Sequence, residues 1–458
     1  MQTSAIVLAA GSGKRMKSAR NKVLHLLCGR PIVGHVVKAC RDVGVDRIYV
    51  VVGRDAEQVQ QVLGPDYTYV LQEQQLGTGH AVMQAEPHLG DEESLLVLYG
   101  DTPLISPTTL QSMIELHQRT QADATVLTAV LDEPGDYGRI VRDEQGNILR
   151  LVEARDASPD IRAIREINTG FYCFRTAPLR SALRQLTNDN AQGEYYLTDV
   201  IAAISADGGR VAGCRLEDMN EALGINDRVR LAEAEDYLRA RIRRRLMLEG
   251  VTFLQPDTCL VDDTVRIGRD TIVYPGCVLE GETIIGEGCT IGPATRLVDT
   301  TVGDDSTLEY TVARQAAVGS GCQIGPFAYL RPQTCLADNV KIGDFVEVKN
   351  SQVGSGSKIP HLSYVGDADI GERVNLGAGT ILVNYDGRQK TRSTIEDDAF
   401  IGCNSNIVSP VTIGQGAYVA AGSTITDDVP ADSLGIARAR QTNKEGWAKR
   451  RREAGKSS

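Results

Sequence analysis

The sequence predicts three consecutive parts: an open, mostly parallel α/β sheet over residues 1–227, a connecting helix over 228–250 and a parallel β-helix over 251–458. Three observations predict this order. Short apolar runs alternate with helical stretches in the first part, a segment rich in Ala, Glu, Arg and Leu follows, and aliphatic residues then recur at every sixth position. Strand–helix alternation is typical of parallel α/β sheets, and a six-residue period is typical of parallel β-helices.

In the first part we predict buried strands over residues 5–9, 47–52, 95–99, 125–130 and 170–174, and helices over 31–43, 109–118 and 195–206. Ligands of such sheets bind beyond the carboxyl ends of the strands. Three of these strands end in glycine-rich or acidic turns, at Gly11-Ser12-Gly13, at Gly53 and at Gly100-Asp101. We therefore expect the three turns to converge on one site.

The connecting segment has apolar residues at helical spacing, namely Leu231, Leu238, Ile242 and Leu246. Gly250 follows them, and glycine is typical of a helix C-terminus. We predict one long helix that ends near Gly250.

The third part carries the strongest signal, because its aliphatic residues fall six apart in three runs. These residues are Ile267, Val273, Leu279, Ile285, Ile291 and Leu297, then Ile324, Leu330, Leu336, Ile342 and Val348, then Ile395, Ile401, Ile407, Ile413, Val419 and Ile425. One aliphatic residue per unit is expected to stack inside the coil, and the glycine that often follows permits a tight corner. A polar interruption at residues 384–392 predicts a loop, which in such proteins often lies on the binding face.

Length and composition agree with a multidomain globular protein and exclude several classes. A chain of 458 residues is too long for one ordinary core. Its net charge of −11 argues against a nucleic-acid partner. The ten cysteines are scattered without metal-ligand spacing, which indicates a reduced, cytosolic protein. We see no signal peptide and no apolar run long enough for a membrane.

Residues 8–16, Leu-Ala-Ala-Gly-Ser-Gly-Lys-Arg-Met, follow the first predicted strand, and Lys22 lies just beyond them. The Walker spacing of a P-loop is absent, and Met16 occupies the third glycine position of a dinucleotide fingerprint. The segment instead resembles the G-x-G-x-R…K signature of sugar-1-phosphate nucleotidylyltransferases. Glycines let backbone N–H groups approach a triphosphate, and Arg15 and Lys22 would neutralise charge on the α-phosphate and pyrophosphate.

Further segments are similar to one branch of that superfamily, in which residues 72–79 would form the uracil-binding loop. The resemblance implies that Asp101 and Asn226 hold Mg²⁺, which prefers hard oxygen ligands. It makes Arg15 and Lys22 the catalytic cations of UMP transfer from UTP to a sugar 1-phosphate, with release of pyrophosphate. The nucleotide and UDP-sugar contacts that it implies are Leu8, Ala9, Ala10, Gly11, Lys22, Gln72, Gly77, Thr78, Tyr99, Gly138, Glu153, Asn168 and Asn226.

With the C-terminal part added, the whole chain resembles one family, the bifunctional N-acetylglucosamine-1-phosphate uridylyltransferases/glucosamine-1-phosphate N-acetyltransferases. Its most specific stretch is residues 359–368, Ile-Pro-His-Leu-Ser-Tyr-Val-Gly-Asp-Ala. The resemblance implies a Rossmann-like nucleotidyltransferase fold, a left-handed β-helix, and a homotrimer with acetyltransferase sites between neighbouring coils. Its substrates would be UTP, N-acetylglucosamine-1-phosphate, glucosamine-1-phosphate and acetyl-CoA.

Acetyl transfer to an amino sugar needs a free amine, and a histidine with an ordinary pKa of about 6.5 is suited to take its proton. The resemblance makes His361 this general base. The acetyl-acceptor contacts that it implies are Arg331, Lys349, Tyr364, Asn375 and Lys390. The acetyl-CoA contacts are Ala378, Asn384, Tyr385, Cys403, Ala421 and Arg438, with Asn384 and Tyr385 orienting the amine or stabilising the oxyanion.

Three residues depart from the family pattern. Lys14 stands where a small hydroxyl residue is usual, Asn21 replaces a proline before Lys22, and Cys403 replaces a serine. We expect Asn21 to loosen its loop and all three to alter constants without loss of function.

Two other functions stay open at this point. One is a nucleotidylyltransferase with a single activity, whose β-helix only assembles subunits. The other is a non-catalytic scaffold built from the same two folds.

Overall fold

The computed structural model describes residues 3–11, 13–90 and 94–454. Its internal contacts divide the chain into two compact units, Met1–Arg241 and Ile242–Ser458. The division falls within helix α8 (Arg228–Leu248), which the sequence analysis predicted as the connecting helix. None of the described helices is long and apolar enough to cross a membrane.

A nine-stranded sheet forms the middle of the first unit, as far as the described residues go. Its main path runs through β11 (Val211–Arg215), β7 (Ala124–Val130), β10 (Glu166–Phe174), β6 (Ser94–Tyr99), β1 (Thr3–Ala9), β4 (Arg47–Val52) and β5 (Thr68–Leu71). The five predicted strands are all present. Neighbours on this path are parallel except at β10, which runs antiparallel to β6 and β7.

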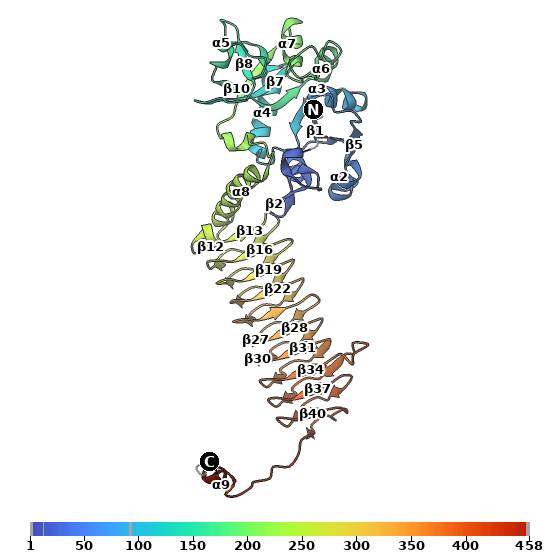
Figure 1. The fold of residues 1–458 in the computed structure, drawn as a ribbon, viewed down its shortest axis with the longest axis vertical. Helices are drawn as coiled ribbons and strands as arrows, with labels where there is room; N and C mark the ends of the chain where they lie inside the picture. Colours follow the sequence, from blue (N-terminus) through green and yellow to red (C-terminus); the bar gives the residue numbers. More distant parts are fainter. Residues whose placement is uncertain (1–2, 12, 91–93, 455–458) are drawn as a thin grey trace. The chain divides into compact units, whose positions relative to one another are not determined.

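Helices cover both faces of this sheet (Figure 1), because successive side chains of its central strands point to opposite sides. In β1, Val7 belongs to one core and Ile6 to the other. The first core includes α1 (Ile32–Asp42), α2 (Ala56–Leu63) and α4 (Pro107–Thr120). The second includes α3 (Thr78–Ala85), α6 (Thr176–Leu183) and α7 (Asp199–Ala206). The result is a layered α/β/α unit with β1 near its centre.

The second unit consists of three parallel sheets of short strands. They begin at β12 (Thr252–Phe253), β13 (Leu260–Val261) and β14 (Arg266–Ile267), and end at β41 (Leu434–Gly435), β40 (Thr424–Ile425) and β38 (Thr412–Ile413). Until the last coil, each strand pairs with the third strand after it, so three strands make one coil. The predicted hexapeptide β-helix is confirmed (Figure 1).

The periodic aliphatic residues fill the interior of this β-helix, and every one predicted to do so is buried. Register pairing stacks Ile342 between Ile324 and Ile359 of the neighbouring coils. A glycine follows such residues where the coils approach closely. A Cβ on Gly268, for example, would lie 2.6 Å from the carbonyl of Gly286 in the next coil.

The polar interruption is a loop between β34 (Ile381–Val383) and β35 (Ser393–Ile395), as predicted. An antiparallel bridge joins Tyr385 to Lys390 inside it. The stacked residues Ile370 and Ile395 are therefore 25 positions apart instead of the 17 that separate Ile342 from Ile359.

We expect Ile342→Ala to lower the free energy of unfolding by about 2–5 kcal/mol, because it leaves a cavity between two stacked neighbours that cannot collapse freely. Lys341→Ala, at the adjacent exposed position of β27 (Lys341–Asp344), should change it by less than about 0.5 kcal/mol. Denaturant unfolding of the two variants beside wild type measures the difference. Equal effects at both positions would contradict an interior made by the periodic residues.

Candidate functional site

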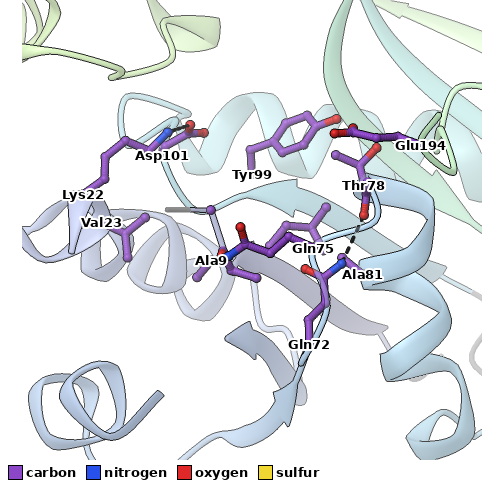
Figure 2. A pocket seen from close by; sticks show the side chains of 14 residues that line it. Ala9, Lys22, Val23, Gln72, Gln75, Thr78, Ala81, Tyr99, Asp101 and Glu194 are labelled. Carbon is purple, nitrogen blue, oxygen red and sulfur yellow. Dashed lines mark hydrogen bonds and ion pairs between the residues drawn. The ribbon is translucent and has the colours of Figure 1, made fainter. Parts of the chain in front are cut away.

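A cavity of about 290 Å³ lies at the carboxyl ends of the parallel strands β1, β5 and β6 (Figure 2). It is lined by Leu8, Ala9, Ala10, Gly11, Lys22, Val23, Gln72, Gln75, Gly77, Thr78, Ala81, Tyr99, Asp101 and Glu194. Most of the nucleotide contacts expected from the sequence are among these residues. Gly53 packs beside them, since a Cβ there would lie 2.7 Å from the carbonyl of Ala10. The three turns thus converge, although Ser12 and the side chain of Lys14 lie outside the described part of the chain.

Lys22 joins the two residues expected to hold magnesium. Its Nζ lies 2.5 Å from Oδ2 of Asp101 and 3.0 Å from Oδ1 of Asn226, and its side chain is buried. Figure 2 shows Lys22 reaching Asp101 at one end of the cavity. The backbone N–H of Ile225 donates to the carbonyl of Asp101, which holds the two segments together. Asp101 and Asn226 therefore share one cation, which here is the chain's own ammonium.

This arrangement fits a magnesium site completed by a substrate. Two hard oxygens converge on one positive group, and Mg²⁺ in proteins commonly takes one or two such ligands together with phosphates and water. The described residues contain no group of three or more His, Cys, Asp or Glu side chains placed to hold a metal. Any divalent ion between Asp101 and Asn226 must therefore draw further ligands from substrate or solvent.

Asn21, which we expected to loosen its loop, makes two side-chain hydrogen bonds. Asn21 is buried, and its Oδ1 accepts from the N–H of Val23, so that it caps the short helix η2 (Lys22–Leu24). Its Nδ2 donates to Asp55 at 3.1 Å. A side chain that caps a helix and bonds a second segment restrains its loop.

The predicted uracil-binding loop is tied to β1 and to itself. Gln75 donates its amide to the carbonyl of Ala10, at the end of β1. The amide nitrogen of Gln72 lies 3.2 Å from the carbonyl of Gly77 and 3.0 Å from a ring nitrogen of His80. These bonds shape the wall of the cavity before any ligand enters.

Gly138, Glu153 and Asn168, three of the UDP-sugar contacts expected from the sequence, form a second cluster. A Cβ on Gly138 would lie 3.6 Å from Cβ of Asn168 and 3.8 Å from Oε2 of Glu153. Burial raises the pKa of Glu153, although the hydroxyl of Thr198 donates to it. Burial and the neighbouring Glu153 also raise the pKa of Tyr99, so the cluster adjoins the cavity that Tyr99 lines. Arg15 is exposed on η1 (Lys14–Met16) and is not among the residues that line the cavity.

In the second unit, three of the expected acceptor contacts form a group of cations. Arg331 pairs with Glu347 at 2.7 Å, and Lys349 pairs with Asp367 at 3.1 Å. Contact with Lys349, and more weakly the charge of Arg331, lowers the pKa of Lys390. A pKa lowered in this way reflects cations that lie close to one another, and a group of cations suits the binding of a dianionic phosphate.

The side chains of Tyr364 and Asn384 both lie close to the backbone of Gly366. Tyr364 begins β31 (Tyr364–Gly366), and the position of a Cβ on Gly366 would fall 2.8 Å from the amide nitrogen of Asn384 and closer still to the Tyr364 hydroxyl. Any side chain at Gly366 would therefore displace both groups. Asn375 lies on β33 (Asn375–Leu376), and Tyr385 is exposed in the loop.

His361 is exposed at the end of β30 (Lys358–His361) and does not face the coil interior. Its Nδ1 lies 2.5 Å from Oδ1 of Asp344, the residue beside it in the preceding coil. The hydrogen bond with His361 holds the pKa of Asp344 below its ordinary value. An ionised Asp344 that accepts from Nδ1–H leaves Nε2 as the free proton acceptor.

The expected acetyl-CoA contacts Ala378, Cys403 and Ala421 form a column along one corner of the β-helix. The N–H of Asn404 donates to the carbonyl of Ala378, and the N–H of Gly422 donates to that of Cys403, so the three lie in successive coils. Cys403 is exposed. Arg438 is exposed just after β41.

The sequence analysis missed Asp344 and Asp367. The signal that could have found them is the coil length: Asp344 precedes His361 by 17 residues, and Asp367 follows Lys349 by 18. In a parallel β-helix, residues one coil apart are neighbours.

Comparison with known proteins gives matches for both units. Residues 5–206 match the model of the MobA-like NTP transferase domain, and residues 264–297 and 392–427 match that of the bacterial transferase hexapeptide, six repeats. The chain is 53% identical to the bifunctional protein GlmU of Geobacillus sp. (strain WCH70), with 97% of each chain covered. It is 54% identical to that of Geobacillus thermodenitrificans, with 99% of each covered, and 52% identical to that of Heliobacterium modesticaldum, with 98% of each covered. A crystal structure of UDP-glucose pyrophosphorylase complexed with UDP-glucose aligns with 53% of this chain and all of that one, at 18% identity and a TM-score of 0.45.

We expect Lys22→Met to bind Mn²⁺ about tenfold more tightly than wild type in the absence of substrate, because the ammonium no longer competes for Asp101 and Asn226. Calorimetric titration with Mn²⁺ measures this affinity directly. Lys38→Met, on the exposed face of α1, is the matched control and should bind like wild type. Adding Asp101→Asn to Lys22→Met should abolish the gain, and a gain that survives would place the metal elsewhere.

Proposed function

The chain belongs to the family of bifunctional GlmU proteins, and from this premise we propose that its two units catalyse two consecutive steps of UDP-N-acetylglucosamine synthesis. Residues 251–458 transfer acetyl from acetyl-CoA to glucosamine-1-phosphate. Residues 1–227 then transfer UMP from UTP to the N-acetylglucosamine-1-phosphate that results, and pyrophosphate leaves. Matches that span nearly all of this chain and of its relatives support assigning both steps to it.

The observation that carries the uridylyl transfer is the shared cation site at the end of β1 and β6. A phosphate oxygen of the sugar 1-phosphate attacks the α-phosphorus of UTP, and the bond to pyrophosphate breaks. The attacking oxygen is already an anion, so no base is needed. Mg²⁺ held by Asp101 and Asn226 would neutralise phosphate charge. Lys22 and Arg15 stabilise the charge on the α-phosphate and the departing pyrophosphate, while residues 72–79 and Gly138, Glu153 and Asn168 position the two substrates.

The observation that carries the acetyl transfer is the His361–Asp344 pair, which precedes the strand that begins with Tyr364. The amine of glucosamine-1-phosphate attacks the thioester carbonyl, its proton passes to Nε2 of His361, and coenzyme A leaves. Asp344 accepts the Nδ1–H bond and stabilises the imidazolium that forms. Arg331, Lys349 and Lys390 bind the phosphate, and the column Ala378, Cys403 and Ala421 leaves room for the pantetheine arm.

The proposal includes a homotrimer. Aromatic side chains stack along one exposed corner of the β-helix, where the ring centroids of Tyr310 and Phe327 lie 5.3 Å apart and those of Phe327 and Phe345 5.4 Å apart. Contiguous exposed apolar surface of this kind supports contact with another copy of the chain.

A coupled assay that starts from glucosamine-1-phosphate, acetyl-CoA and UTP tests both activities. We expect His361→Ala to lose acetyl transfer by about 10²–10⁴-fold, because no other group takes the amine proton, while it still uses N-acetylglucosamine-1-phosphate. Arg15→Ala should acetylate normally and accumulate N-acetylglucosamine-1-phosphate. Each variant is expected to keep the activity of the unit that it does not alter, and this retained activity is the control for the integrity of the protein.

Two outcomes would support the other functions left open by the sequence. Wild type that makes UDP-N-acetylglucosamine only from the acetylated sugar phosphate would be a single-activity enzyme with an assembling β-helix. Wild type that performs neither step would be a scaffold.

A further inference from the structure

Asp367 is a buried carboxylate at the centre of the cation group in the second unit. It lies between β31 and β32 (Ala368–Ile370), its side chain is 9% exposed, and its φ is 53°. Aspartate and asparagine tolerate this left-handed conformation better than most residues. None of the contacts assigned to substrates so far involves it.

Three side chains donate to this one carboxylate. Nζ of Lys349 lies 3.2 Å from Oδ1 and 3.1 Å from Oδ2, and Nδ2 of Asn350 lies 2.5 Å from Oδ1. Nδ2 of Asn384 donates to Oδ2. Lys349 is 18 residues before Asp367 and Asn384 is 17 after it, so Asp367 joins one coil to the coil on either side.

The bond to Asn384 fixes the orientation of that amide. Because Nδ2 points to Asp367, Oδ1 is turned away from the carboxylate and is left as an acceptor. A substrate amine offers N–H donors, and an amide oxygen is their complement. The same carboxylate sets the position of the Lys349 ammonium, which is the complement of a phosphate.

We propose that Asp367 is a positioning residue for acetyl transfer: it holds Lys349 toward the phosphate of the acceptor and turns Oδ1 of Asn384 toward its amine. One residue thereby fixes the distance between the two groups that recognise the ends of glucosamine-1-phosphate. This inference rests on the proposed acetyltransferase function.

Charge supports the same role. Burial alone would raise the pKa of Asp367, yet the bonds from Asn350, Lys349 and Asn384 outweigh it and lower that pKa. Lys390 has its pKa lowered chiefly by Lys349, and the charge of Asp367 acts in the opposite direction. Asp367 therefore remains ionised at neutral pH and helps Lys390 to stay protonated beside the other cations.

Asp367→Asn tests the inference, because it keeps the shape and suits the backbone conformation while it removes the charge. We expect KM for glucosamine-1-phosphate to rise and kcat to fall, each by about tenfold or more, since a charged acceptor shared by Lys349 and Asn384 is lost. The alkaline limb of kcat/KM should move to lower pH, because Lys390 loses a neighbouring anion. The KM for acetyl-CoA and uridylyl transfer from N-acetylglucosamine-1-phosphate should stay as in wild type.

Asp398→Asn is the matched control. Asp398 also has a positive φ, of 61°, and accepts from a side chain of a neighbouring coil, but that side chain is Arg373. It should leave both constants and the pH profile unchanged.

The outcomes separate the inference from the function beneath it. If wild type acetylates glucosamine-1-phosphate and Asp367→Asn behaves like Asp398→Asn, the positioning role is overturned while the function stands. A loss that disappears when assays are run well below the unfolding temperature of Asp367→Asn would show a structural role only and would also overturn it. If wild type does not transfer acetyl to glucosamine-1-phosphate, both the positioning role and the proposed acetyltransferase function are overturned.

Discussion

The stacking of one aliphatic residue per strand inside the β-helix is the constraint on which the second unit depends. It sets a coil of 17 or 18 residues, because Ile342 must lie between Ile324 and Ile359. Because of this length, residues that are 17 or 18 positions apart in the chain lie next to each other in neighbouring coils. His361 meets Asp344, and Asp367 meets both Lys349 and Asn384, through the same repeat that packs the interior. Catalytic geometry in this unit is therefore a consequence of core packing.

This dependence explains what could be predicted from the sequence and what could not. The periodic residues, five strands of the first unit and the loop at 384–392 were predictable, because the hydrophobic period and the turn residues are local features of the sequence. The antiparallel direction of β10 was not predictable, because a run of buried apolar residues has the same pattern in a parallel and in an antiparallel strand. The bond from Asn21 to Asp55 was not predictable either, because the two residues are 34 positions apart in the chain. Asp344 and Asp367 were missed because the residues next to a carboxylate in a turn do not indicate which side chain of another coil it contacts.

The two units balance their phosphate-binding cations in different ways. In the first, Lys22 is paired with Asp101 and Asn226, whose oxygens also suit a divalent ion, so this pairing can be exchanged when metal and triphosphate enter. In the second, Arg331 is paired with Glu347, and Lys349 is paired with Asp367. Under the proposed function, a divalent metal would therefore serve the uridylyl transfer, because the oxygens of Asp101 and Asn226 are placed to receive it.

The loop at residues 384–392 interrupts the repeat next to the proposed acceptor site. Lengthening one coil to 25 residues brings Lys390 back over the wall that carries Lys349. The extra backbone is closed by Arg392, which pairs with Asp369 and donates to the carbonyls of Asn350 and Ala368. Arg392 therefore returns the chain to the stack beside Asp367, so the insertion adds reach without loosening the coils that hold His361 and Asn384.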